Sequence, residues 1–274
     1  MYVSKRLGRG KPIRKITLSL IVFILFAAGI VSFFYIPQFR IREITLKGFT
    51  SLNQEDLNAE ILQVLDKKYF YILPYDNVFL LPKEEISARL QSRFSRVKNV
   101  ALSRDFPQGI TVEIRERKLQ GLWCPALEDG SLAPANDPQE SPQLCFYIDE
   151  DGIIFEKAPI FSGAIFLKFL DERGNALRLG EPILPIDEFR KLIQFHQLLN
   201  QNLNISITEV ILKKDGIYEL YTNDHWYIIL NEQNDAKITA ENLSLALGFQ
   251  IKKRASSLKY IDLRFGNKIF YKFR

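Results

Sequence analysis

The spacing of apolar residues changes several times along the chain, and each change marks a different predicted element. The first block is an unbroken run at residues 16–36, ITLSLIVFILFAAGIVSFFYI, which holds no charged residue. A helix of these 21 residues is about 30 Å long, which matches the hydrocarbon core of a bilayer. The pattern therefore predicts one membrane-spanning helix over residues 16–36.

A strand and a helix are predicted next. Residues 39–48, FRIREITLKG, alternate as a strand that ends in a glycine turn, with Ile41 out of phase as in a bulge or a lead-in segment. Asn53 is placed to cap a helix, and Glu55 and Asp56 suit the positive end of the helix dipole. The inward face of this helix is predicted to hold four residues: Leu57, Ile61, Leu62 and Leu65.

A loop rich in aromatic residues, YFYILPYDNVF, leads to a second helix that Pro82 opens at a first-turn position. Three residues form the predicted inward face of this helix: Ile86, Leu90 and Phe94. Two alternating strands follow, joined by a turn at residues 107–109. The order β-α-α-β-β over residues 39–118 predicts a three-stranded sheet with both helices packed on its apolar face.

The remaining residues, 119–274, are rich in short strands. Predicted strands bracket a proline-rich loop and a DEDG turn, and SITEVILKKDGIYELYTNDHWYIIL is typical of a three-stranded meander. Two helices are predicted, one after Pro185 and one at residues 235–253. The predicted inward residues of the first are Phe189, Leu192, Ile193, His196 and Leu199. The expected fold class is α+β: a transmembrane helix, a β-α-α-β-β domain, then a mixed or antiparallel β-rich domain with two helices.

The last fifteen residues, YIDLRFGNKIFYKFR, place every apolar side chain from Ile261 to Phe273 except Phe270 on an odd position. A hairpin with a loop of odd length, residues 266–268, would pair Phe265 with Ile269 and keep this apolar set on one face. One continuous kinked strand is the alternative. Either arrangement predicts an outer edge that no later residue of the sequence covers. A partner could add a strand there, and the alternative is an edge that is covered internally or only protected by the charges of Lys268, Lys272 and Arg274.

The net charge of +5 is confined to the N-terminal tail. Residues 1–15 hold six basic side chains and no acid, and the other 31 basic residues are balanced by 32 acidic ones. This balance argues against nucleic-acid binding by the body of the protein. The basic flank instead places residues 1–15 in the cytoplasm and the residues after Pro37 outside. A cleaved signal peptide is the alternative, but no A-x-A-like site precedes Pro37.

The sequence contains two cysteines, Cys124 and Cys145, in the part expected outside the cell membrane. An oxidising compartment favours a disulfide between them, and closing such a loop stabilises a fold by about 3 kcal/mol. Two free thiols are the alternative.

No residues form a recognisable catalytic or cofactor site. His196 is expected in the apolar face of a helix and His225 in an exposed hairpin turn, so neither is set beside a nucleophile. The two cysteines and two distant histidines lack metal-ligand spacing. The DEDG run lacks the further ligands of a calcium loop, and no glycine-rich phosphate loop is present. A membrane-tethered hydrolase is therefore disfavoured, and no enzyme activity, metal or cofactor is expected.

Three stretches of residues 39–118 carry a family resemblance: FRIREITLKG, VKNVALSRDFP and ITVEIRERK. They resemble the POTRA domain of the FtsQ/DivIB cell-division proteins, and the final YIDLRFGNKIFYK is similar to the end of that family's second domain. The order of basic tail (1–15), span (16–36), POTRA domain (39–118) and β-rich domain (119–274) also resembles the family. The segment between the cysteines is a departure from its pattern, as is the end of the chain directly after its last strand.

The resemblance implies a non-enzymatic, single-pass scaffold of the divisome, at the septum in the cell membrane. The implied partners are the membrane coiled-coil proteins FtsB/DivIC and FtsL, with other divisome components on the POTRA domain. The residues that match the family's binding region are Tyr260, Asp262, Arg264, Phe265, Gly266 and Lys268. The alternative function is a membrane-anchored POTRA chaperone in secretion or outer-membrane assembly.

Overall fold

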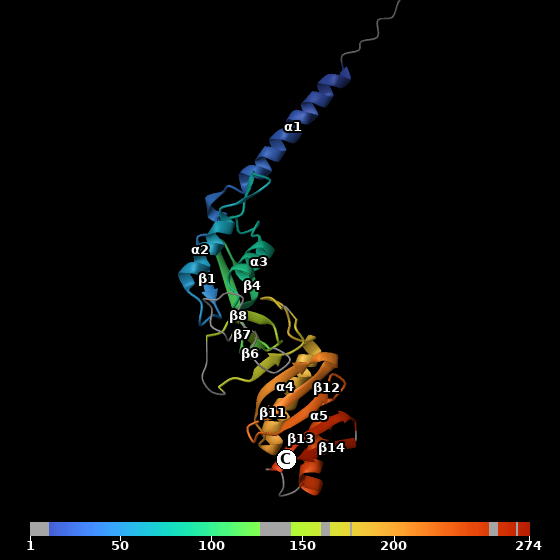
Figure 1. Ribbon diagram of the computed structural model, residues 1–274. Helices are drawn as coiled ribbons and strands as arrows, with labels where there is room; N and C mark the ends of the chain where they lie inside the picture. Colours follow the sequence, from blue (N-terminus) through green and yellow to red (C-terminus); the bar gives the residue numbers. More distant parts are fainter. Residues whose placement is uncertain (1–10, 127–143, 160–164, 176, 252–256, 267) are drawn as a thin grey trace, which may run out of the picture. The chain divides into compact units, whose positions relative to one another are not determined.

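The computed structural model describes most of the chain (Figure 1). The described residues are 11–126, 144–159, 165–175, 177–251, 257–266 and 268–274. They form helices and strands in an α+β arrangement, which confirms the predicted fold class. The chain divides into two compact units, Met1–Glu116 and Arg117–Arg274.

The N-terminal apolar run forms a single helix, α1 (Lys11–Phe33). Its segment Ile16–Phe33 has a mean hydropathy of 2.6 and contains no buried residue, and it is long and apolar enough to span a membrane. The helix begins five residues before the predicted span and ends three residues before its predicted end. Pro37 accounts for the early end, because a proline disfavours helical backbone at the residue before it. A short 3-10 helix, η1 (Pro37–Phe39), follows.

The first unit contains the predicted three-stranded sheet. Its strands are β1 (Glu43–Lys47), β4 (Val97–Asp105) and β5 (Gly109–Glu116), in the order β1-β5-β4. β1 is parallel to β5, and β4 is antiparallel to it. Ile41 lies before β1, so it belongs to a lead-in segment and not to a bulge.

Two helices, α2 (Gln54–Leu65) and α3 (Lys83–Arg93), pack on this sheet. The Asn53 side chain caps α2 by accepting a hydrogen bond from the Glu55 backbone N–H at 2.8 Å, as predicted. Two details differ from the prediction. Leu62 is half exposed and Val64 is buried in its place, and Pro82 is the N-cap of α3 instead of a first-turn residue. The aromatic loop between the helices forms an unpredicted hairpin of β2 (Lys68–Tyr69) and β3 (Leu73–Pro74).

The second unit is built on one mixed sheet of nine strands, in the order β14-β13-β12-β11-β10-β9-β6-β7-β8. Its strands are β6 (Leu119–Pro125), β7 (Phe146–Asp149), β8 (Ile154–Lys157), β9 (Lys168–Asp171), β10 (Ile207–Lys213), β11 (Ile217–Thr222), β12 (Tyr227–Asn231), β13 (Leu258–Phe265) and β14 (Lys268–Phe273). The predicted meander corresponds to β10, β11 and β12, with the short 3-10 helix η2 (Lys214–Gly216) at its first turn.

The two helices of this unit connect parallel neighbours. α4 (Ile186–Leu203) joins β9 to β10, and α5 (Ala236–Leu245), continued by a π-helical turn (Ala246–Ile251), joins β12 to β13. Both helices contribute to one apolar core with the sheet (Figure 1). The helix predicted at 235–253 corresponds to α5 and the π-helical turn up to Ile251, and residues 252 and 253 lie outside the described residues. On α4, Phe195 is buried in the core, whereas His196 is only half buried, so its predicted core position is wrong.

The chain's final segment is a hairpin, but its predicted register is wrong. Phe265 pairs with Lys268, so the turn has two residues instead of three. The register then shifts between Asp262 and Phe265, and Asp262 pairs with Phe270. The extra residue that the prediction placed in the turn therefore lies in a bulge on β13. As a consequence Phe265 is exposed and does not face the core.

A buried carboxylate closes the turn between β7 and β8. Asp149 is fully buried, and its Oδ2 accepts a hydrogen bond from Arg117 Nη1 at 2.5 Å. Its Oδ1 accepts the backbone N–H groups of Asp151 and Ile153, both at 2.9 Å. The predicted DEDG turn is therefore held from inside by its own first residue.

We predict that Asp149→Ala lowers the free energy of unfolding by about 3 to 5 kcal/mol, because it leaves the Arg117 charge and two backbone donors without this partner. Asp151→Ala is the matched control, since Asp151 pairs with the largely exposed Arg190 and its loss is expected to cost less than about 1 kcal/mol. Denaturant unfolding of the detergent-solubilised chain, followed by circular dichroism, measures both. Equal effects for the two variants would contradict the prediction.

Candidate functional site

The sheet of the second unit ends in an edge strand, β14. Among the described residues, β14 pairs with β13 and with no other strand. One side of a strand in this position carries backbone N–H and C=O groups that do not take part in the sheet. Together, the outer side of β14 and the exposed end of the β13–β14 hairpin form what we call the C-terminal edge.

The residues of β13 divide between the two faces of the sheet. Ile261 and Leu263 are buried in the core beside the helices. Tyr260, Asp262 and Arg264 alternate with them and lie on the opposite face. These three predicted binding residues are thus on the face that α4 and α5 do not cover.

Asp262 and Arg264 form a tight ion pair on this face. Arg264 Nε donates to Asp262 Oδ1 at 2.9 Å, and Arg264 Nη2 donates to Asp262 Oδ2 at 2.7 Å. The hydrogen bond and charge of the Asp262 carboxylate raise the pKa of Arg264. Asp262 is only 6% exposed, so it orients Arg264 and offers a partner little surface of its own.

The end of the hairpin presents aromatic surface. Phe265 and Phe270 are each 53% exposed, and their rings meet edge to face with centroids 5.3 Å apart. The Arg264 guanidinium lies 5.4 Å from the centroid of the Phe265 ring. Gly266 turns the chain with a φ of +65°, a conformation that glycine adopts without steric cost, and Lys268 beside it is exposed.

A row of tyrosines extends from β13 across the same face. The Tyr260 ring is 5.6 Å from that of Tyr227, which stacks on Tyr221 at 4.9 Å. Burial raises the pKa of both Tyr221 and Tyr227, and the Glu219 carboxylate adds to the effect. Both phenols therefore remain protonated at neutral pH and can donate hydrogen bonds.

The structure thus brings all six predicted residues to one end of the sheet, with Asp262 in a supporting position. Sequence reasoning missed Phe270, Tyr221 and Tyr227. Phe270 is at an even position, outside the apolar set at odd positions, and was therefore given no role. The predicted meander includes Tyr221 and Tyr227 but did not single them out, because their proximity to Tyr260 depends on strand order.

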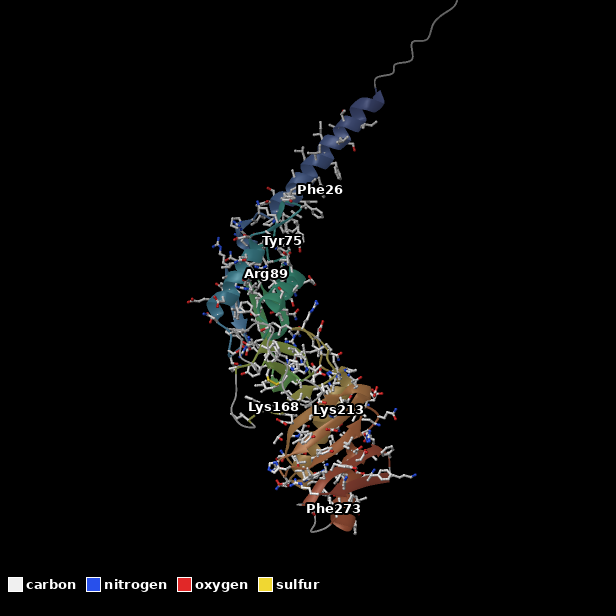
Figure 2. All side chains as sticks on the ribbon, in the orientation of Figure 1. Phe26, Tyr75, Arg89, Lys168, Lys213 and Phe273 are labelled. Carbon is white, nitrogen blue, oxygen red and sulfur yellow. A yellow bond between two sulfur atoms is a disulfide. The ribbon has the colours of Figure 1, made fainter. Side chains whose placement is uncertain are left out.

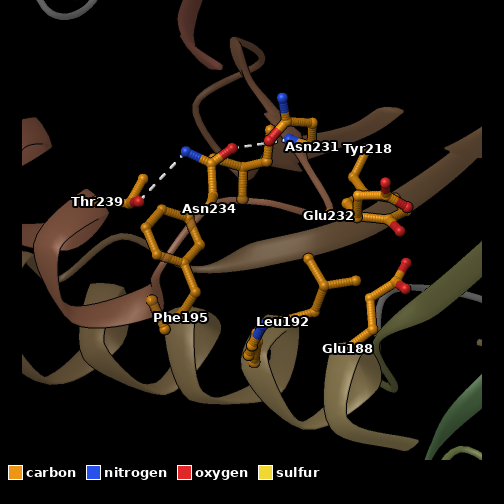
Figure 3. A pocket seen from close by; sticks show the side chains of 11 residues that line it. Glu188, Leu192, Phe195, Tyr218, Asn231, Glu232, Asn234 and Thr239 are labelled. Carbon is orange, nitrogen blue, oxygen red and sulfur yellow. Dashed lines mark hydrogen bonds between the residues drawn. The ribbon is translucent and has the colours of Figure 1, made fainter. Parts of the chain in front are cut away.

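A small cavity elsewhere in this unit contains two acidic residues (Figure 3). Glu188 on α4 and Glu232 after β12 approach each other at its rim, and burial together with the Glu232 charge raises the pKa of Glu188. The cavity has a volume of about 20 Å³, which suits one water molecule and is too small for a substrate.

The histidines are not part of a catalytic arrangement in the described residues. His225 lies in the turn before the buried Trp226 with a φ of +62°, as its predicted turn position implies. His196 Nδ1 is buried and has no hydrogen-bond partner among the described residues, contrary to the expected satisfied core position. No group of three His, Cys, Asp or Glu side chains in the described part of the chain could hold a metal ion.

Burial lowers the pKa of His196 below its ordinary value of 6.5. As the pH falls, the unfolded chain binds this proton before the folded chain does, so the free energy of unfolding is expected to decrease below about pH 6.5. The decrease is at most about 1.4 kcal/mol per pH unit. His196→Leu is expected to remove this component in denaturant unfolding between about pH 7 and pH 5.5. An unchanged pH dependence in the variant would contradict the assignment.

The cysteines join neighbouring strands. A disulfide links Cys124 on β6 to Cys145, which directly precedes β7. It belongs to a small apolar cluster on the face of the sheet away from the helices, with Leu122, Leu170 and Ile211. The segment between the two cysteines, residues 127–143, lies outside the described residues.

We predict that both cysteines resist alkylation in the folded, unreduced chain and react only after the disulfide has been reduced. Intact mass after iodoacetamide treatment, with and without prior reduction in denaturant, measures this. Quantitative labelling without reductant would show two free thiols. Replacing both cysteines by serine is expected to lower the free energy of unfolding by about 3 kcal/mol.

Comparison with known families identifies one match. Residues 39–117 match the family model described as POTRA domain, FtsQ-type. This range covers the lead-in segment, all three strands of the first sheet and both helices packed on it. No curated protein sequence matches the chain.

Proposed function

We propose that this chain, whose FtsQ-type POTRA domain at residues 39–117 supports a place in the FtsQ/DivIB family, is a membrane-anchored scaffold of bacterial cell division. The FtsQ-type POTRA family is one of non-enzymatic scaffolds. The apolar helix α1 fits a single-pass anchor, and the basic tail before it favours a cytoplasmic N-terminus. Both folded units would then lie outside the cytoplasm, at the division septum.

The proposed partners of the second unit are coiled-coil membrane proteins of the FtsB/DivIC and FtsL type, with other divisome components on the POTRA domain. The observation that carries this proposal is the position of β14 at the edge of the nine-stranded sheet. A partner segment that extends the sheet would satisfy the outward backbone groups of β14, and its side chains would contact the exposed rings of Phe265 and Phe270.

Magnitudes indicate which contacts would dominate such a complex. Each added backbone hydrogen bond contributes about 0.5 to 1.5 kcal/mol, since it replaces a bond to water. Full burial of a phenylalanine side chain contributes about 1.5 to 3 kcal/mol. The backbone bonds would therefore set the register, while Phe265 would be the principal anchor.

We predict that Phe265→Glu weakens binding to the extracytoplasmic segment of an FtsB/DivIC-type partner at least about tenfold, because it places a charge where the complex would bury an aromatic ring. Phe249→Glu is the matched control, since Phe249 is 73% exposed in the same unit but lies outside the C-terminal edge. Biolayer interferometry on the detergent-solubilised full chain measures both affinities. Equal affinities for the two variants would contradict the anchor role of Phe265.

Arg264→Glu is a poorer test of the same surface. It would place a second carboxylate beside the buried Asp262, so a loss of binding would also report a disturbed β13.

Hydrogen exchange tests the strand addition itself. In the complex, amides of β14 are expected to exchange more slowly than in the free chain, because the outward N–H groups gain acceptors. If binding occurs but protection is found only at residues away from β14, a surface contact without strand addition is indicated. Unchanged exchange throughout this unit, with no measurable affinity, would count against the partner assignment as a whole.

A further inference from the structure

The hairpin between α2 and α3 carries two bulky aromatic side chains at its tip. Phe70 is 88% exposed and Tyr71 is 95% exposed, the highest values among the large apolar side chains of the described residues. Ile72 beside them is 53% exposed. Neither tip ring contributes to the core of the first unit. Their placement therefore calls for a contact that packing within the unit does not supply.

The backbone of this tip is unfavourable for the residues it holds. Phe70 has a φ of +49° and Tyr71 a φ of +63°, and the Ile72 N–H donates to the Tyr69 carbonyl at 2.9 Å. Two successive positive φ values in a closed turn are typical of a type I′ turn, which favours Asn-Gly. Bulky side chains are disfavoured at these positions, so local turn stability does not explain the aromatic pair.

The hairpin is tied to the end of α1. The Tyr35 hydroxyl, two residues beyond the helix, donates a hydrogen bond to the Ile72 carbonyl. Asn77, which is fully buried, donates from Nδ2 to the Phe34 carbonyl at 3.0 Å. The stem is braced by the rings of Tyr69 and Tyr75, whose centroids are 4.1 Å apart, and Figure 2 labels Tyr75.

Further aromatic residues link α1 to the first unit. The Phe33 ring at the last residue of α1 is 5.6 Å from Phe39 and 6.1 Å from Phe79. The Phe79 ring in turn is 5.5 Å from Phe106. Phe33, Phe79 and Phe106 are all more than 40% exposed. An exposed apolar surface therefore continues from the membrane-spanning helix onto the folded unit.

We propose that Phe70, Tyr71 and Ile72 insert into the headgroup and upper acyl region of the same bilayer that α1 spans. The proposal rests on the membrane anchorage proposed above. We choose a lipid surface as the partner of these side chains because the hydrogen bonds of Tyr35 and Asn77 hold the hairpin next to the end of α1, where the first unit meets the membrane. Aromatic side chains are favoured at that depth, and the exposed Lys68 beside the tip suits anionic headgroups. With α1, the hairpin gives the POTRA domain a second membrane attachment.

Single tryptophan substitutions in the full chain test this contact. The protein is reconstituted in vesicles of phosphatidylethanolamine and phosphatidylglycerol whose acyl chains are brominated near the glycerol. Phe70→Trp probes the tip, and its emission is compared with that of the parent, whose two tryptophans are buried. Lys47→Trp is the matched control, because Lys47 is exposed and is expected to lie outside the bilayer. It follows Arg40 by seven residues, which span about 23 Å when the chain is extended. Phe26→Trp reports on α1 itself.

The expected result is a blue-shifted Phe70→Trp emission with a several-fold loss of intensity in brominated vesicles, and no loss for Lys47→Trp. Quenching of Phe26→Trp with an unquenched Phe70→Trp would overturn the hairpin proposal and leave the anchorage intact. If Phe26→Trp is also unquenched, both the anchorage and the hairpin insertion are wrong.

A stability measurement separates a lipid contact from a structural role of the rings. The double variant Phe70→Asn, Tyr71→Gly supplies the residues that the turn geometry favours. We expect the denaturation midpoint of this double variant in detergent to equal or exceed that of the parent. When Ile72→Trp is added to the double variant, we expect its tryptophan to lie less deeply in brominated vesicles than Ile72→Trp alone. A lowered midpoint would mean that the aromatic pair holds the fold, which would overturn the proposal.

Discussion

The architecture of the second unit depends on three parallel strand pairs within a mostly antiparallel sheet. Parallel neighbours cannot be joined by a hairpin, and each such pair requires a crossover connection. These pairs are β6 with β9, β9 with β10, and β12 with β13. The chain passes through β7 and β8 between the strands of the first pair, and α4 and α5 are the crossovers of the other two. Both helices bury their apolar residues in the same core, so one face of the sheet is covered and β14 is left at an edge.

This arrangement decides which residues of β13 can contact a partner. Ile261 and Leu263 are committed to the core beneath the helices, so only the alternate residues and the end of the hairpin are available. Asp262 pairs with Arg264 and thereby positions its guanidinium over Phe265. The exposed surface of the C-terminal edge is consequently aromatic and cationic, with its carboxylate largely buried.

The first unit uses the same constraint on a smaller scale. β1 is parallel to β5, and the chain between them forms α2, α3 and the antiparallel β4. The aromatic hairpin lies in the connection from α2 to α3. Its strands β2 and β3 do not pair with the three-stranded sheet, so that sheet does not restrict the residues of the hairpin. Its bulky tip residues are compatible with the fold because the stem and the contacts to Phe34 and Tyr35 determine its position.

The sequence alone determined the order and type of most elements, because apolar period distinguishes helices from strands over short windows. It also predicted the Asn53 cap, the DEDG turn and the β-α-α-β-β order, which depend on local chemistry. It misplaced Leu62, which is half exposed while Val64 is buried, and His196, which is half buried while Phe195 lies in the core. Only the tertiary structure decided the register of the last hairpin, because a bulge between Asp262 and Phe265 changes parity without any sequence signal. The neighbours of each strand, and with them the row of Tyr221, Tyr227 and Tyr260, likewise depend on contacts between segments far apart in the chain, which local periodicity does not encode.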